Sequence, residues 1–191
     1  MISSFFLHKS NFLKKADKSK KGSIDRKIQS LVNAINKKKD YFTTSSCSGR
    51  IVLFDSGKGK KNEGEWLFVS HDLINADAKK KPFISLLKIK KENKQNCWFR
   101  FEPVIMHANC SNLESAQKLL DLARNSGFKL SGIISAKKAT VEIRSSERID
   151  VPAEIINPDD LDVLVKKANE KLKETHKKIS KLKEGLKILS S

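Results

Sequence analysis

The last part of the chain repeats its apolar side chains with a period that a long helix satisfies. Spacings of four and three residues alternate there, which is a period of 3.5 residues. The residues of this seam are Leu161, Val165, Ala168, Leu172, Thr175, Ile179, Leu182, Leu186 and Leu189. We therefore expect a long C-terminal helix over residues 158–189. A narrow seam needs a covering helix, either one predicted over residues 24–39 or the same helix in a homodimer.

Two shorter segments also have helical periodicity. Residues 24–39 place Ile28, Leu31, Val32 and Ile35 on one stripe. Ser111 and Glu114 match the S-x-x-E capping box and predict a helix that runs to about Ser126. Its inward residues are Ala116, Leu119, Leu120 and Ala123, with Gly127 just past its end.

Between and after these helices lie strand-like runs. They cover residues 41–45, 50–55, 65–71, 83–90, 97–107, 132–135, 140–144 and 149–151. Pro103 predicts a bulge or an edge, and the last three runs suggest a hairpin with one added strand. No G-x-G-x-x-G follows a strand, so a Rossmann-type fold is not expected. We predict a single α+β domain over residues 1–191, with a mixed or antiparallel, strongly curled or barrel-like sheet packed with helices.

The chain is strongly basic. Its 191 residues include 39 Lys or Arg and 22 Asp or Glu, a formal net charge of +17. Eleven basic residues and two acids lie between Lys9 and Lys39. We therefore expect residues 1–23 to form a basic N-terminal segment. An anionic partner, most commonly nucleic acid, explains such a charge. The alternative is a lysine-rich surface without a specific partner.

Several protein classes are excluded or disfavoured by composition. No apolar run approaches the roughly 20 residues of a membrane-spanning helix, and we expect no membrane association. The cysteines, Cys47, Cys97 and Cys110, are odd in number and form no CxxC pair. With no secretory apolar region near the N-terminus, a reduced, cytoplasmic protein is expected.

Residues 41–50 contain the most unusual string, YFTTSSCSGR. Its hydroxyls and turn amides can form an anion nest, and Arg50 can bind a carboxylate or phosphate. Cys47 is a possible nucleophile. The plain alternative is a polar hairpin between two strands.

Two histidines are predicted at strand ends. His71 ends the run 65–71, and His107 ends the run that also contains Glu102. Such groups can perform acid–base chemistry. One alternative is that the histidine nitrogens are hydrogen-bonded within the core and only stabilise the fold. The other is a His₂-carboxylate metal site; we expect no metal.

Several strings together resemble the tRNA wybutosine-synthesizing protein 3 family. The matching strings lie at residues 16–25, 42–50, 66–71, 101–107, 125–128, 131–133, 143–146 and 151–152, and the resemblance extends along most of the chain. The resemblance implies a methyltransferase that uses S-adenosyl-L-methionine. Its substrate would be the N4 nitrogen of a 4-demethylwyosine-type base in the anticodon stem-loop of tRNA(Phe).

The resemblance suggests roles for the strings it covers. As proton acceptors we consider His71, His107 and Glu102. As cofactor ligands we consider Ser45, Ser46, Cys47, Ser48, Gly49 and Arg50. For RNA binding we consider Asp17, Lys20, Lys21, Ser23, Asp25 and Trp66, where Trp66, Phe42 or Tyr41 would stack on the tricyclic base.

Two other functions remain open at this point. One is a non-catalytic RNA- or ribosome-binding module, in which the hydroxyl-rich string and histidines are structural. The other is a cysteine-dependent hydrolase that uses Cys47 with His71 or His107. Labelled methyl incorporation into tRNA separates the first from a methyltransferase, and a Cys47→Ala variant separates the second.

The double variant Lys20→Ala, Lys21→Ala should weaken tRNA binding, because two phosphate contacts are lost. The log–log slope of affinity against salt should flatten by about one unit per lost contact. Affinity for S-adenosylmethionine should stay largely intact. Binding titrations at several salt concentrations measure both; an unchanged slope would contradict this role.

Overall fold

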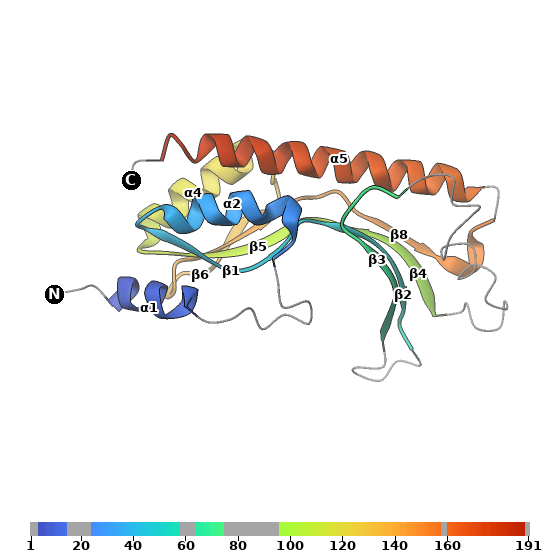
Figure 1. Ribbon diagram of the computed structural model, residues 1–191, viewed down its shortest axis with the longest axis horizontal. Coiled ribbons are helices and arrows are strands. Elements are labelled where there is room, and N and C mark those ends of the chain that lie inside the picture. Colours follow the sequence, from blue (N-terminus) through green and yellow to red (C-terminus); the bar gives the residue numbers. More distant parts are fainter. Residues whose placement is uncertain (1–3, 15–23, 58–63, 75–95, 158–159, 190–191) are drawn as a thin grey trace. The chain divides into compact units, whose positions relative to one another are not determined.

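The computed structural model describes residues 4–14, 24–57, 64–74, 96–157 and 160–189, and these form an α+β protein (Figure 1). The helices are α1 (Ser4–Leu13), α2 (Arg26–Lys37), α4 (Leu113–Asn125) and α5 (Leu161–Gly185), with a short 3₁₀ helix η3 (Ala153–Ile155). The strands are β1 (Tyr41–Cys47), β2 (Arg50–Asp55), β3 (Glu65–Ser70), β4 (Cys97–Glu102), β5 (Ile105–Cys110), β6 (Gly132–Ser135), β7 (Thr140–Arg144) and β8 (Ile149–Pro152).

The strands form two open sheets, not the curled barrel that we expected. Their orders are β1-β5-β7-β6 and β3-β2-β4-β8, and the strand pairs of the described residues are all antiparallel. Consecutive strands belong to different sheets at three places, from β1 to β2, from β4 to β5 and from β7 to β8. The predicted long strand over residues 97–107 is broken at Pro103, which has no backbone N–H for the ladder.

Two strand pairings suggested by the sequence differ from those in the structure. Residues 41–45 and 50–55 do not form a hairpin, because β1 pairs with β5 whereas β2 pairs with β3 and β4. The run at 149–151 does not extend the β6–β7 hairpin, because β8 pairs with β4. The hairpin itself is confirmed. The strand predicted over residues 83–90 lies outside the described residues.

The chain divides into two compact units, each with its own core. The first unit comprises Met1–Ser48, Val104–Ser146 and His176–Ser191. Helices α2 and α4 cover one face of its sheet, as Figure 1 shows. The stripes predicted for both helices are buried: Ile28, Leu31, Val32 and Ile35 on α2, and Ala116, Leu119, Leu120 and Ala123 on α4.

The second unit comprises Gly49–Pro103 and Glu147–Thr175. The inward side chains of β2 and β4 and the first turns of α5 form its core. Its buried members include Ile51, Leu53, Phe99, Phe101, Leu161, Val165, Ala168 and Leu172. Asn169 on α5 also holds the segment after β3, since its amide bonds the N–H and the C=O of Ile74 at 2.9 and 2.6 Å.

The ends of α4 follow local rules, with one correction. The cap is Asn112 and not Ser111, because the Asn112 side chain accepts from the Ser115 N–H at 2.8 Å. Ser111 instead bonds the Ser115 hydroxyl at 3.2 Å. At the other end Gly127 has φ +102° and Phe128 is fully buried, as the glycine signal predicts.

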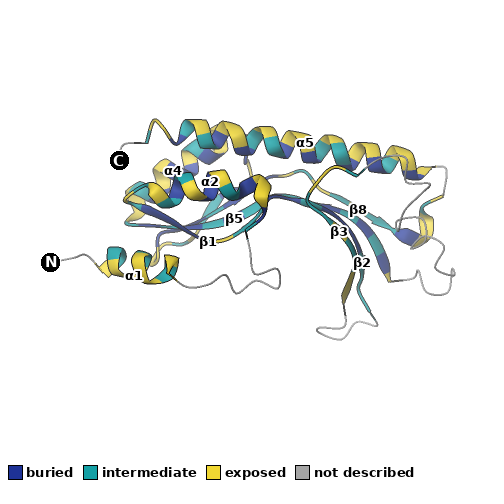
Figure 2. Ribbon diagram, viewed as in Figure 1, coloured by how far each residue is buried: buried dark blue, intermediate teal, exposed yellow. Residues whose placement is uncertain are grey.

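The seam on α5 is confirmed, but its partner is not a coiled-coil helix. Eight of the nine seam residues are buried, in a stripe visible in Figure 2. Leu172 and its neighbours pack on a sheet, whereas Ile179, Leu182 and Leu186 lie in the core cluster that contains α2 and α4. Gly185 allows this approach, since a Cβ there would lie 2.5 Å from Cδ1 of Leu122. The chain therefore buries the seam that a homodimer would use.

Replacing Leu172 by Ala should lower the free energy of unfolding by about 2–5 kcal/mol, because Leu172 is fully buried and a cavity remains. Val163 lies on the same helix with 60% of its surface exposed. A Val163→Ala control should change the free energy by about 0.5 kcal/mol or less. Urea denaturation measures both, and equal losses would refute the packing of the seam.

Candidate active site

Three polar side chains lie in one line across the first sheet. The Ser45 hydroxyl is 2.8 Å from Nδ1 of His107, and Nε2 of His107 is 2.9 Å from a carboxylate oxygen of Glu142. Strand register explains the line, since Ser45 on β1 faces His107 on β5, which faces Glu142 on β7. The sheet therefore presents a hydroxyl, an imidazole and a carboxylate in sequence.

The partners of His107 define its neutral tautomer. A carboxylate only accepts, so Nε2 bears the hydrogen and donates to Glu142. The other nitrogen, Nδ1, then accepts from the Ser45 hydroxyl. A proton delivered to Ser45 can thus pass to His107, and the imidazolium would be stabilised by Glu142. The arrangement is suited to general base chemistry.

This line lies on the face of the sheet opposite the core. His107 alternates with Met106 and Ala108, and Glu142 alternates with Val141 and Ile143, all four of which are buried. Because side chains of a strand alternate between faces, the polar residues face outward. Their side chains are partly exposed, 30% for His107 and 22% for Glu142.

Helix α1 covers another part of the same face. Phe42 is opposite Asn109 on β5 and is fully buried. The rings of Phe5, His8 and Phe12 lie 5.4–5.5 Å from the Phe42 ring. Phe42 is therefore occupied by α1, which makes it a poor stacking platform for a substrate.

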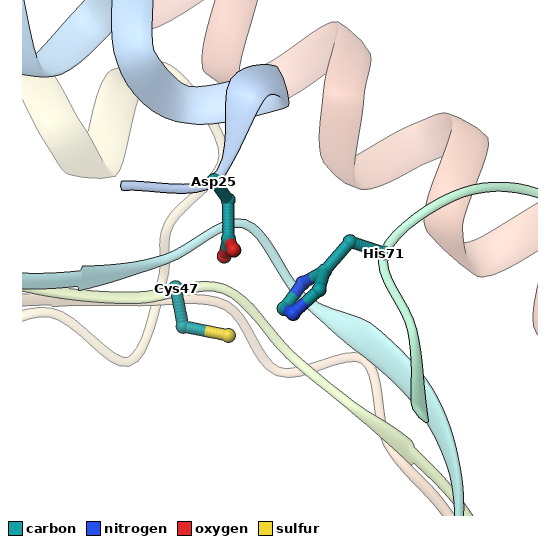
Figure 3. A group of neighbouring side chains, drawn as sticks. All are labelled: Asp25, Cys47 and His71. Atoms are coloured by element: carbon teal, nitrogen blue, oxygen red, sulfur yellow. The ribbon is translucent and has the colours of Figure 1, made fainter. Parts of the chain in front are cut away.

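At the end of β1 an aspartate anchors the chain (Figure 3). Asp25 precedes α2, is 6% exposed, and accepts from the Ser48 N–H at 3.1 Å. An oxygen of this carboxylate lies within 4.8 Å of Sγ of Cys47. The Ser48 amide, predicted to bind an anion, is therefore directed at a side chain of the protein itself.

The remaining described candidates belong to the second unit. Arg50 donates through Nε to Glu102 at 2.7 Å and lies 4.2 Å from the centre of the Trp66 ring. Glu102 thus has a guanidinium partner. His71 follows β3, an edge strand whose residues are exposed or half-buried, and its Nδ1 donates to the Gly49 carbonyl at 3.1 Å.

The predicted site residues thus fall into two groups. Ser45, Ser46, Cys47, Ser48, Asp25 and His107 lie in the first unit, and Gly49, Arg50, Trp66, His71 and Glu102 in the second. Asp17, Lys20, Lys21 and Ser23 lie outside the described residues. Sequence reasoning missed Glu142. Its position between Val141 and Ile143 indicates an outward side chain, but only the β5–β7 pairing places it beside His107.

The three cysteines differ in their surroundings. All lie among the described residues and none is in a disulfide; Cys47 is half-buried, whereas Cys97 and Cys110 are buried. Burial is the main cause that raises the pKa of Cys110 to about 12, with a smaller effect of the Asp40 carboxylate. Cys110 therefore stays protonated near neutral pH.

Comparison with known proteins identifies the family. The sequence profile described as methyltransferase TYW3 matches residues 7–188. The chain belongs to this family. A relative from Danio rerio, named tRNA wybutosine-synthesizing protein 3 homolog, is 38% identical, with 96% of this chain and 74% of the relative aligned. Because the family is described as a methyltransferase, this chain is an enzyme that transfers a methyl group.

An archaeal relative matches over nearly its whole length. The protein from Thermococcus sibiricus is 38% identical, covering 96% of this chain and 98% of the relative. It is named tRNA(Phe) 7-((3-amino-3-carboxypropyl)-4-demethylwyosine(37)-N(4))-methyltransferase.

Solved structures share the fold. The PH1069 protein from Pyrococcus horikoshii OT3 superposes with a TM-score of 0.81 at 31% identity, covering 99% of this chain and 96% of that one. A protein from Aeropyrum pernix superposes with a TM-score of 0.69 at 28% identity, covering 86% of this chain and 98% of that one.

Among the described residues, no helix has the length and apolarity to cross a membrane.

Iodoacetamide should alkylate Cys47 first in the folded protein at pH 8. With a pKa of about 12, only about one Cys110 thiol in ten thousand is a thiolate at that pH, and the group is 2% exposed. Peptide mass spectrometry after timed labelling measures the order, with labelling in urea as the control. Alkylation of Cys110 as fast as Cys47 in the folded state would contradict its burial.

Proposed function

We propose that this protein methylates the N4 nitrogen of a 4-demethylwyosine-type base at position 37 of tRNA(Phe), with S-adenosyl-L-methionine as the methyl donor. The observation that supports this most is the outward line of Ser45, His107 and Glu142 in a chain of the methyltransferase TYW3 family. The name of the relative from Thermococcus sibiricus supports the substrate. The 7-aminocarboxypropyl form in that name is the substrate we favour.

The residues at the end of β1 fit a sulfonium donor. S-adenosylmethionine supplies an electrophilic methyl group on a positively charged sulfur. The Asp25 carboxylate, within 4.8 Å of the Cys47 thiol, offers a counter-charge for a cation. We therefore assign Asp25 to the methyl donor and not to RNA, whose phosphates it would repel.

The line across the sheet removes the proton of the acceptor nitrogen. When the N–CH₃ bond forms and the S–CH₃ bond breaks, the nitrogen must release one proton. Ser45 accepts that proton while passing its own hydroxyl proton to Nδ1 of His107. Glu142 holds Nε2–H and stabilises the resulting imidazolium. Aligning the reacting atoms provides much of the remaining acceleration.

The RNA would be bound by other parts of the chain. The anticodon stem-loop is the anion that explains a net charge of +17, and Lys20 and Lys21 are its proposed phosphate ligands. Trp66 is the proposed stacking residue, since it is 38% exposed whereas Phe42 and Tyr41 are buried. We also propose that both units act together as one domain without a Rossmann-type nucleotide site, since the family match spans residues 7–188.

A serine hydrolase, distinct from the cysteine-dependent hydrolase considered from the sequence, is a second candidate function with one observation in its favour. Ser45, His107 and Glu142 have the residue types of a hydrolytic triad. In the usual triad, however, the hydroxyl bonds Nε2 and the carboxylate bonds Nδ1, whereas here the two nitrogens are exchanged. Together with the family, this favours the proton relay of a methyltransferase.

Labelled S-adenosylmethionine incubated with tRNA(Phe) that contains the demethylated tricyclic base tests the proposal. We expect one methyl group incorporated per tRNA and loss of more than 100-fold in kcat for His107→Ala. tRNA without the tricyclic base is the control. Binding of the tRNA without any methyl transfer by the wild-type protein would refute the proposal and favour a binding module.

Glu142→Gln should lower kcat by roughly 10-fold, because the imidazolium formed during proton transfer loses its carboxylate partner. The KM for tRNA should change little. Glu114→Gln on α4, where Glu114 pairs only with exposed Lys118 at 2.6 Å in the described residues, is the matched control. An unchanged kcat in folded Glu142→Gln would show that Glu142 takes no part in the proton transfer.

A further inference from the structure

The second sheet has an unusual row of side chains on the face opposite its core. Ring contacts and guanidinium contacts follow one another without a break. Arg50 lies 4.2 Å from the Trp66 ring, Trp66 lies 4.7 Å from Phe54, and Arg100 lies 5.0 Å from Phe54 and 5.4 Å from Trp98. We call these five residues the arginine–aromatic row.

Strand alternation and register place the row on one face. On β4, Trp98 and Arg100 alternate with the core residues Phe99 and Phe101. On β2, Phe54 faces Trp98 on one side and Trp66 on β3 on the other. The α5 residues of this unit pack in the core cluster on the other face. The row therefore belongs to the face that the core does not use.

The row is partly open to solvent. Trp66 is 38% exposed, and the side chains of Arg50 and Arg100 are 28% and 21% exposed. Aromatic rings that only stabilised the sheet would not need a guanidinium group beside each of them. A protein with so few aromatic residues, 7% of the chain, nevertheless places three of them together here.

Among the described residues, the ion pairs of the row contain more cations than carboxylates. Arg50 is paired with Glu102 at 2.7 Å, and Arg100 and Arg148 share Asp150. Three guanidinium groups thus face two carboxylates. Arg50 uses only Nε in its bond to Glu102, and its other N–H donors lie outside that bond. Such a surface suits a negatively charged partner.

Single-stranded RNA has the matching chemistry. Each nucleotide offers a flat base that stacks on an aromatic ring or a guanidinium plane, and a phosphate that guanidinium groups bind. Carboxylates such as Glu102 and Asp150 can accept from the amino group of cytosine. A duplex, in contrast, hides its base faces in its own stack. The row therefore fits the nucleotides of an RNA loop better than a helical stem.

We propose that the arginine–aromatic row binds unpaired nucleotides of an RNA loop by stacking. This inference rests on the proposed function, under which the loop is that of the tRNA anticodon. It extends the role of Trp66 from one stacking residue to a surface that includes Phe54, Trp98 and Arg100, and it makes recognition of the loop a property of the second unit.

Binding of an unmodified anticodon stem-loop RNA tests the inference in the full chain. Trp66→Leu should weaken this binding about 5- to 150-fold, the value of losing one stacked base. Trp66→Phe should restore most of it, because the ring is kept. A blunt duplex with the same stem sequence should bind the wild type and Trp66→Leu equally. Val163→Ala, an exposed apolar change elsewhere in the same unit, is the matched control.

The salt dependence and a second variant sharpen the test. Because stacking releases no counterions, Trp66→Leu should keep the wild-type slope of affinity against salt. Trp98→Leu tests a second residue of the row independently. Circular dichroism confirms that each variant is folded. Equal affinity of folded Trp66→Leu, Trp98→Leu and wild-type proteins for the stem-loop would overturn the inference and point to a protein partner for this face.

Two readouts separate this inference from the proposed function. If the wild type binds the stem-loop through the row but transfers no methyl group, the row stands and the proposed function fails. If methyl transfer occurs and the KM for tRNA is unchanged in Trp66→Leu and Trp98→Leu, the proposed function stands and the row is overturned.

Discussion

The apolar stripe of α5 is the constraint on which both cores depend. Leu161, Val165, Ala168 and Leu172 complete the core of the second unit, and Ile179, Leu182 and Leu186 complete that of the first. An open antiparallel sheet is stable when one face is covered and the other is solvated. In each unit the covered face includes part of this stripe, so the opposite face of each sheet can hold polar and aromatic side chains for function.

Strand alternation then couples stability to chemistry. His107 lies between buried Met106 and Ala108, Glu142 between buried Val141 and Ile143, and Arg100 between buried Phe99 and Phe101. A slip of one residue in register would move each polar group into a core, which costs several kcal/mol for a buried charge. The hydrophobic core therefore also sets the positions of the proposed proton relay and the arginine–aromatic row.

The junctions between strands show where local signals misled the prediction. Ser46, Cys47, Ser48 and Gly49 have the composition of a tight turn, yet the chain passes there from one sheet to the other. Ser48 is fully buried and bonded to Asp25, and Gly49 adopts φ +84°. Pro103 likewise follows the last residue of β4, where the chain passes from the second sheet to β5 in the first. Composition indicates that the chain changes direction at such places, but it does not indicate which strand becomes the next partner.

Features that depend only on residues close together in the chain could be predicted from the sequence alone. The helical stripes of α2, α4 and α5, the end of α4 at Gly127, the β6–β7 hairpin and the α+β class all follow from spacing within one segment. Ser45 and His107 were also singled out from the sequence, Ser45 as a cofactor ligand and His107 as a proton acceptor, because their strings are unusual and resemble a family.

The division into two open sheets, the covering of the α5 seam inside the chain, and the pairing of His107 with Glu142 were decided only by the tertiary structure. Strand partners far apart in sequence are selected by how well whole faces pack together, and no short window contains that information. The sequence thus determined which segments are helices and strands and which way their side chains face. The fold decided which of those side chains meet.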